Sequence, residues 1–184
     1  MFSKPCPSGV APQASLSVFG KIRDWTLDLL FPRFCAGCGK EGFFICPECL
    51  KKLPRQKSVS CFFCQKRLGD GFVCRKCKEK YHLKIDGIFV AADWSDPLLR
   101  EIIYLYKYSF IKELGKELAE IISDFLIIQR ILENLDGAKI FAPVPLFKRR
   151  LIWRGFNQAG ILAERLGKKF EIEFKEILER PRAT

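Results

Sequence analysis

Two stretches of this 184-residue chain repeat one cysteine pattern: CAGCGKEGFFICPECLKK over residues 35–52 and CFFCQKRLGDGFVCRKCKEK over residues 61–80. Each copy holds two Cys-x-x-Cys pairs, a turn with glycine, a short apolar stretch and a lysine-rich end. The spacers between the pairs are seven and nine residues long. The repeat indicates one small structural unit made twice.

The eight paired cysteines predict two structural zinc sites. A two-residue spacer lets one tight turn present two thiolates to one metal, and a structural zinc ion takes four such ligands in a tetrahedron. With every ligand supplied by cysteine, no position stays open for water, so the metal is expected to be structural. The predicted ligands are Cys35, Cys38, Cys46, Cys49, Cys61, Cys64, Cys74 and Cys77.

How the pairs share the two ions is a second question. Because each copy reads as a complete ribbon, the repeat favours sequential pairing, with each ion held inside one copy. An interleaved cross-brace is the alternative. In both cases residues 35–80 are expected to form a double zinc ribbon.

Composition sets outer limits on the function. The ninth cysteine, Cys6, makes the count odd, and the N-terminus lacks the basic-then-apolar order of a secretion signal, which favours a reducing compartment and the cytoplasm. No apolar run is long enough to span a bilayer. The net charge of +11 permits binding to nucleic acid, phosphates or an anionic surface, without choosing among them.

Two segments precede the paired cysteines. Residues 1–18 predict a disordered lead-in. Residues 19–34 predict an amphipathic helix, because Ile22, Trp25 and Leu29 recur at helical spacing before Pro32 ends the pattern.

From residue 85 onward the pattern is that of an α/β domain with a parallel sheet. Strands are expected over 85–94, 138–146 and 169–178. Between them, one helix begins at the Asp96 cap, a second carries an apolar stripe over 110–126, and a third runs from the Asn157 cap to Gly167.

A basic cluster stands between the second strand and the third helix. It consists of Lys148, Arg149, Arg150 and Arg154. In open α/β sheets ligands bind at the carboxyl ends of strands, where helix N-termini attract anions and arginine forks match phosphate oxygens. A phosphorylated ligand fits this cluster, but from these residues alone a solvated basic loop is the favoured interpretation.

The segment PVPLFKRRLIWRGFNQ (143–158) resembles the ComF family of competence-associated proteins. The paired zinc knuckles agree with it, as do LLFPRFCAGC (29–38), IIYLYKYSF (102–110) and LERPRAT (178–184). The resemblance covers about residues 25–184. It implies an α/β fold in which the double zinc ribbon precedes a type I phosphoribosyltransferase-like domain over 85–184.

The family resemblance also implies a chemistry. Phosphoribosyltransferases bind Mg²⁺ and phosphoribosyl pyrophosphate, and displace pyrophosphate from the anomeric carbon of the ribose. On that basis Arg149, Arg150 and Arg154 would contact pyrophosphate or belong to a loop that closes over it. Lys107 matches a lysine of the family and would face the same pocket, with a surface lysine as the alternative.

One family motif is missing. The ribose-phosphate loop is an acidic pair followed by a Thr-Thr-Gly-x-Thr-like turn, whereas the two threonines here are Thr26 and Thr184. The sequence is therefore expected to be a fragment with an incomplete phosphoribosyltransferase-like domain, inactive as it stands. Binding of Mg²⁺ and phosphoribosyl pyrophosphate is expected of a full-length form, and whether the chain is an enzyme is left open.

Two functions follow as hypotheses. The first is a ComF-like role in DNA uptake and competence. The second is a non-enzymatic zinc-ribbon module that binds single-stranded DNA or a partner protein such as a competence helicase-like ATPase. Phe62, Phe63 and Phe72 among basic residues could provide a surface for single strands, but the favoured interpretation places these rings in the small core of the ribbon.

Overall fold

The computed structural model describes residues 32–56, 60–67, 72–135 and 139–182. The lead-in predicted over 1–18 and most of the helix predicted over 19–34 lie outside these residues. The chain divides into two compact units between Leu53 and Pro54. Within the described residues, no helix is long and apolar enough to cross a membrane.

The first unit is built around the first cysteine copy. A tight turn carries Cys35 and Cys38, and the helix α2 (Pro47–Lys52) follows Cys46. Ile45 and Leu53 are buried with the cysteines, so they supply the apolar part of this small core.

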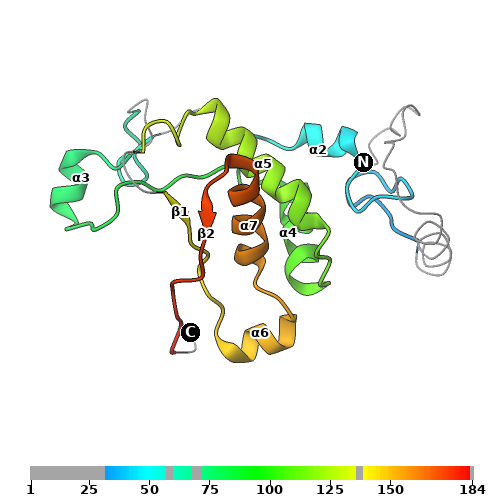
Figure 1. Ribbon diagram of the computed structural model, residues 1–184. Helices are drawn as coiled ribbons and strands as arrows, with labels where there is room; N and C mark the ends of the chain where they lie inside the picture. The colour runs from blue at the N-terminus through cyan, green and yellow to red at the C-terminus, as the bar shows by residue number, and fades with distance from the viewer. Residues whose placement is uncertain (1–31, 57–59, 68–71, 136–138, 183–184) are drawn as a thin grey trace. The chain divides into compact units, whose positions relative to one another are not determined.

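The second unit holds the second cysteine copy and the remaining elements (Figure 1). In chain order these are α3 (Arg75–Lys80), α4 (Pro97–Tyr108), α5 (Leu114–Ile128), β1 (Ile140–Phe141), α6 (Lys148–Arg154), α7 (Gln158–Phe170) and β2 (Glu173–Phe174).

The predicted helix starts are confirmed by their caps. The backbone N–H of Leu99 donates to Asp96 Oδ1 at 2.8 Å, and Pro97 occupies the first turn of α4. The N–H of Ala159 donates to Asn157 Oδ1 at 3.2 Å at the start of α7. Short polar side chains at these positions satisfy backbone donors that the helix itself leaves unpaired.

The predicted end of α7 at Gly167 is wrong. The helix continues to Phe170, and Glu171 ends it in the left-handed conformation, with φ of 56°. Gly167 instead lets the backbone at Ile172 lie close to the helix, because a Cβ at position 167 would lie 2.8 Å from the carbonyl oxygen of Ile172.

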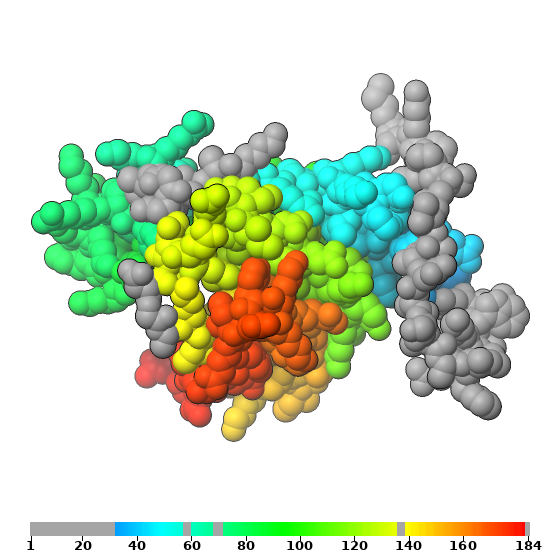
Figure 2. Space-filling model, turned by 45° about the horizontal axis from the view of Figure 1, so that its top comes forward, coloured from blue at the N-terminus to red at the C-terminus, as the bar shows by residue number. Residues whose placement is uncertain are grey.

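The core of the second unit lies between α5 and α7, which pack side by side (Figure 2). The apolar stripe predicted for α5 is confirmed by its buried members: Leu114, Leu118, Ile121 and Phe125. Ala163 and Leu166 are buried on α7. Gly115 lets Ile161 and Tyr106 approach α5 closely, since a Cβ there would lie 2.7 Å from the Ile161 side chain.

The sheet is small and parallel. Strand β1 pairs with β2 in the register Ile140 with Glu173 and Phe141 with Phe174, and α7 packs against both strands (Figure 1). The parallel pairing across an intervening helix agrees with the α/β prediction, but each strand has two residues, much shorter than predicted.

The strand predicted over 85–94 does not form. This segment makes only isolated bridges, from Gly87 to Phe72 and from Ala92 to Arg55. Phe89 and Ala91 pack instead against the buried Phe125 and Ile131. Its apolar residues therefore pack in the core without forming the hydrogen bonds of a strand. Composition alone does not distinguish these two outcomes. The fold is mixed and mainly helical, with a two-stranded sheet.

Candidate metal centres and a basic pocket

The eight predicted ligands gather into two clusters of four cysteines. One holds Cys35, Cys38, Cys46 and Cys49, and the other holds Cys61, Cys64, Cys74 and Cys77. Within each cluster all sulfur atoms lie within 4.8 Å of one another. The grouping is sequential, one cluster per copy, and not interleaved.

The two copies repeat one another bond for bond at the knuckle. The N–H of Gly39 donates to the carbonyl of Cys35 at 2.8 Å, and the N–H of Gln65 donates to that of Cys61 at 2.8 Å. Gly39 and Gln65 have φ of 73° and 60°. Glycine adopts this left-handed conformation at little cost, so Gln65 keeps the geometry of the turn against its own preference.

The second pair of each copy also matches. The N–H of Cys46 donates to Cys35 Sγ at 3.2 Å, and the N–H of Cys74 donates to Cys61 Sγ at 3.5 Å. The sulfur atoms of Cys38 and Cys46 lie 3.6 Å apart, as do those of Cys64 and Cys74. Cys46 and Cys74 each precede a six-residue helix, α2 or α3.

These clusters fit zinc. Backbone N–H groups that point at sulfur stabilise the thiolate, the form that binds metal. The N–H of Cys74 is the main cause that lowers the pKa of Cys61 to about 6. At Cys35 burial opposes ionisation, but the N–H groups of Cys46, Gly37 and Cys38 outweigh it and lower the pKa to about 7. Two all-cysteine clusters of this kind are consistent with two structural zinc ions.

A family model described as the double zinc ribbon domain matches residues 26–78. No curated protein matches the chain, and no solved structure does. Together with the two four-cysteine clusters, the match establishes a double zinc ribbon module.

The aromatic residues of the second copy do not form its core. Phe62 and Phe63 are 50% and 36% exposed, so the core placement predicted for them is wrong. The core consists of Cys61, Val73 and Cys77, with Cys74 and Leu83 packed against it. Phe72 is the partial exception, because it is half-buried and contacts Phe89 with ring centroids 5.8 Å apart.

The exposed rings form a short aromatic surface. Phe63 stacks on Tyr81 with centroids 5.3 Å apart and an interplanar angle of 27°, and Phe62 meets Phe63 edge-on at 5.6 Å. We call Phe62, Phe63 and Tyr81 the aromatic platform. The same copy carries these exposed cations: Lys66, Arg67, Arg75, Lys76, Lys78 and Lys80.

A cavity of about 500 Å³ lies between α4, α5, the loop after β1 and the start of α7. Of the predicted phosphate-binding residues, Lys107 and Arg154 line it, whereas Arg149 and Arg150 are exposed on α6 and do not. Sequence reasoning missed Arg180, which also lines it. Arg180 belongs to LERPRAT (178–184), a segment to which no ligand contact was assigned, and chain folding brings it to this wall.

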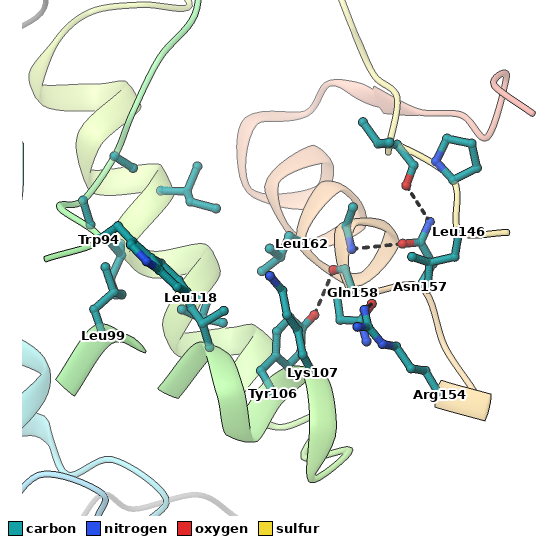
Figure 3. Close-up of a pocket in the computed structure, with 18 of the residues that line it drawn as sticks. Trp94, Leu99, Tyr106, Lys107, Leu118, Leu146, Arg154, Asn157, Gln158 and Leu162 are labelled. Atoms are coloured by element: carbon teal, nitrogen blue, oxygen red, sulfur yellow. Dashed lines mark hydrogen bonds between the residues drawn. The ribbon is translucent and has the colours of Figure 1, made fainter. Parts of the chain in front are cut away.

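The first turn of α7 organises the polar side of the cavity (Figure 3). Asn157 Nδ2 donates to the carbonyl of Val144 at 3.2 Å and ties the loop after β1 to the helix. Arg154 Nη1 donates to Gln158 Oε1 at 3.0 Å. Tyr106 donates to the backbone carbonyl of Gln158 at 2.9 Å, and burial raises the pKa of Tyr106 to about 12.

The cavity combines cations with apolar walls. Trp94, Leu99 and Leu118 lie across from Arg154 and Gln158 (Figure 3). None of the described residues that line the cavity is acidic. The arrangement suits an anionic ligand, since the low dielectric of an apolar wall strengthens the attraction between a cation and an anion.

Proposed function

We propose that this chain is a ComF-like protein with a role in DNA uptake, in which residues 35–80 form the zinc module and residues 85–184 a phosphoribosyltransferase-like domain. The resemblance of residues 143–158 to that family motivates the proposal. It rests on one observation: Lys107 and Arg154, which are 47 positions apart in the sequence, line the same cavity. The proposed location is the cytoplasm, with a helicase-like ATPase as a protein partner.

The proposed ligand of a full-length form is phosphoribosyl pyrophosphate with its Mg²⁺. Arg154 and Lys107 would neutralise phosphate oxygens inside the cavity. Arg149 and Arg150 would contact pyrophosphate from α6 outside it. Cations that meet a departing pyrophosphate stabilise the charge that develops on it, which is the main electrostatic demand of phosphoribosyl transfer.

Calorimetric titration of a full-length form, one that carries the ribose-phosphate loop, with phosphoribosyl pyrophosphate and Mg²⁺ tests this proposal. We expect saturable binding, weakened about tenfold or more in Arg154→Gln, because a charge-assisted hydrogen bond contributes about 1.5–3 kcal/mol. Lys168→Gln is the matched control: this exposed lysine on α7 pairs with Glu164 and does not line the cavity. Absence of binding by the full-length form would rule out the phosphoribosyltransferase-like function.

A second candidate function is binding of single-stranded DNA, favoured by the exposure of the aromatic platform. Bases stack on exposed rings without regard to sequence, and neighbouring cations hold the phosphate backbone. Lys80 Nζ lies 5.2 Å from the centroid of the Tyr81 ring, so charge and stacking surface coincide here.

Fluorescence anisotropy with a labelled oligothymidine tests the second function. We expect binding that weakens steeply with salt. Phe63→Ala should reduce the binding free energy by about 1–3 kcal/mol, the contribution of one base stacked on an aromatic ring. Phe110→Ala, at a phenylalanine 42% exposed outside the zinc module, is the control and should bind like the unmodified chain. Equal affinity in both variants would remove the aromatic platform from the proposal.

A further inference from the structure

Two buried hydrogen-bond donors on residues that line the cavity have no partner. Gln158 is 6% exposed, and its Nε2 atom makes no hydrogen bond. Arg154 Nε is also buried and makes none. Both residues line the cavity. Buried polar atoms are almost always paired in folded proteins, and those left over commonly meet a ligand or an ordered water.

The orientation of the Gln158 amide is fixed by its neighbour. A guanidinium has only donors, so the amide oxygen must face Arg154, as the 3.0 Å bond from Nη1 to Oε1 shows. Nε2 is therefore held as a donor on the other side. The backbone of α7 contributes the positive end of its dipole at the same place, since Gln158 is the first residue of the helix.

The polar groups of this part of the cavity wall are hydrogen-bond donors, so they suit a ligand that carries acceptors. Gln158 Nε2 and Arg154 Nε offer N–H bonds, and Lys107 adds an ammonium group to the lining. An oxyanion satisfies several donors at once through its separate oxygens, whereas a neutral hydroxyl or carbonyl group satisfies fewer.

The rest of the cavity wall is apolar and suits an apolar part of a ligand. The side chains of Trp94, Leu99, Ile103, Leu118, Ile122 and Leu162 line the cavity. A volume of about 500 Å³ falls within the range of small-molecule sites. A ligand with an apolar ring would complement this wall.

We infer that the cavity binds a small organic oxyanion, a phosphate or carboxylate group carried on an apolar ring, with Gln158 and Arg154 gripping the anionic group. Gln158 is a ligand contact in this scheme. The inference does not depend on phosphoribosyl transfer, because its ligand differs from phosphoribosyl pyrophosphate by the apolar part.

The test uses four probes on the full chain: phenyl phosphate, benzoate, phenol and inorganic phosphate. Nitrogen-15 NMR reads the side-chain amide of Gln158 and the Nε–H of Arg154 directly. We expect both signals to shift on saturation with phenyl phosphate, benzoate or both. Phenol and inorganic phosphate, each lacking one half of the ligand, should bind at least tenfold more weakly. The comparison of phenyl phosphate with benzoate identifies the anionic group.

Variants separate the two halves of the site. Gln158→Glu keeps the side-chain length and the oxygen that accepts from Arg154, but it places a carboxylate beside the bound oxyanion. This variant should abolish binding at neutral pH, because the two negative charges repel each other. Trp94→Ala alters an exposed residue, so folding is preserved; it should weaken phenyl phosphate severalfold and leave inorganic phosphate unchanged. Lys168→Gln, which alters an exposed lysine of α7 that pairs with Glu164 and does not line the cavity, should bind normally.

Two results would overturn the inference. One is that neither phenyl phosphate nor benzoate shifts the Gln158 and Arg154 signals. The other is that neither phenyl phosphate nor benzoate binds more tightly than phenol and inorganic phosphate. Either result leaves the proposal for phosphoribosyl pyrophosphate standing, because that ligand is measured separately.

Discussion

The hydroxyl of Tyr106 donates a 2.9 Å hydrogen bond to the backbone carbonyl oxygen of Gln158, which joins α4 to the first turn of α7. Tyr106 is 2% exposed, and burial raises its pKa to about 12, so the phenol stays protonated and keeps donating at neutral pH. The bond fixes the backbone of the residue whose side chain lines the cavity. A structural contact in the core thus also positions the candidate site.

We expect Tyr106→Phe to lower the free energy of unfolding by about 1–3 kcal/mol, because the buried carbonyl of Gln158 loses its donor. Urea denaturation measures the change. Tyr104→Phe is the control, since Tyr104 is 57% exposed on the same helix and its hydroxyl is accessible to water. Equal stability of the two variants would show that the bond contributes nothing.

The two buried glycines of α7 should respond in opposite ways to alanine. In Gly167→Ala the new Cβ would lie 2.8 Å from the carbonyl oxygen of Ile172, so backbone must move, at a cost of about 1–3 kcal/mol. In Gly160→Ala the nearest atom is 3.5 Å away, an ordinary contact, and helix propensity favours alanine by up to about 1 kcal/mol. Thermal unfolding of the pair would contradict this if Gly167→Ala were the more stable.

Features that depend on a few neighbouring residues could be predicted from the sequence. The Cys-x-x-Cys pairs predicted both metal clusters, because a two-residue spacer itself sets the turn. The Asp96 and Asn157 caps were predicted for the same reason, since the capping side chain bonds to an N–H two or three residues away.

Several features that depend on distant neighbours were not predicted. The apolar residues of 85–94 have the composition of a strand, but Phe89 and Ala91 pack on Phe125 instead of joining a ladder. Exposure of Phe62 and Phe63 could not be read from their type, because so small a module buries its cysteines first. The unpaired donors of Gln158 and Arg154 exist only once α6 and α7 are in place.

The sequential pairing of the zinc ligands leads to a crossed experiment. In the double variant Cys38→Ser with Cys46→Ser, both changes fall in one cluster, so zinc should drop from two ions to one per chain. In Cys38→Ser with Cys64→Ser, one ligand is lost from each cluster, so the affinity for zinc should fall at both sites. Native mass spectrometry counts the metal. An interleaved cross-brace would give the reverse pattern, with the first variant losing both ions.

Glu117 should make stability fall as the pH rises above the ordinary range of a carboxyl group. Burial raises its pKa above the usual 4.5, against the opposing charges of Lys116 and Arg165, and its Oε2 atom is buried without a hydrogen bond. The folded chain therefore binds more protons than the unfolded chain between pH 4.5 and the raised value, so the free energy of unfolding decreases as pH rises through that window.

We expect Glu117→Gln to flatten this dependence and to be more stable at neutral pH by roughly 1 kcal/mol, because no ionised oxygen is then left buried and unpaired. Urea denaturation across the window measures it, with Glu101→Gln, an exposed glutamate on α4, as the control. A pH profile identical in the two variants would show that Glu117 titrates as it does in the unfolded chain.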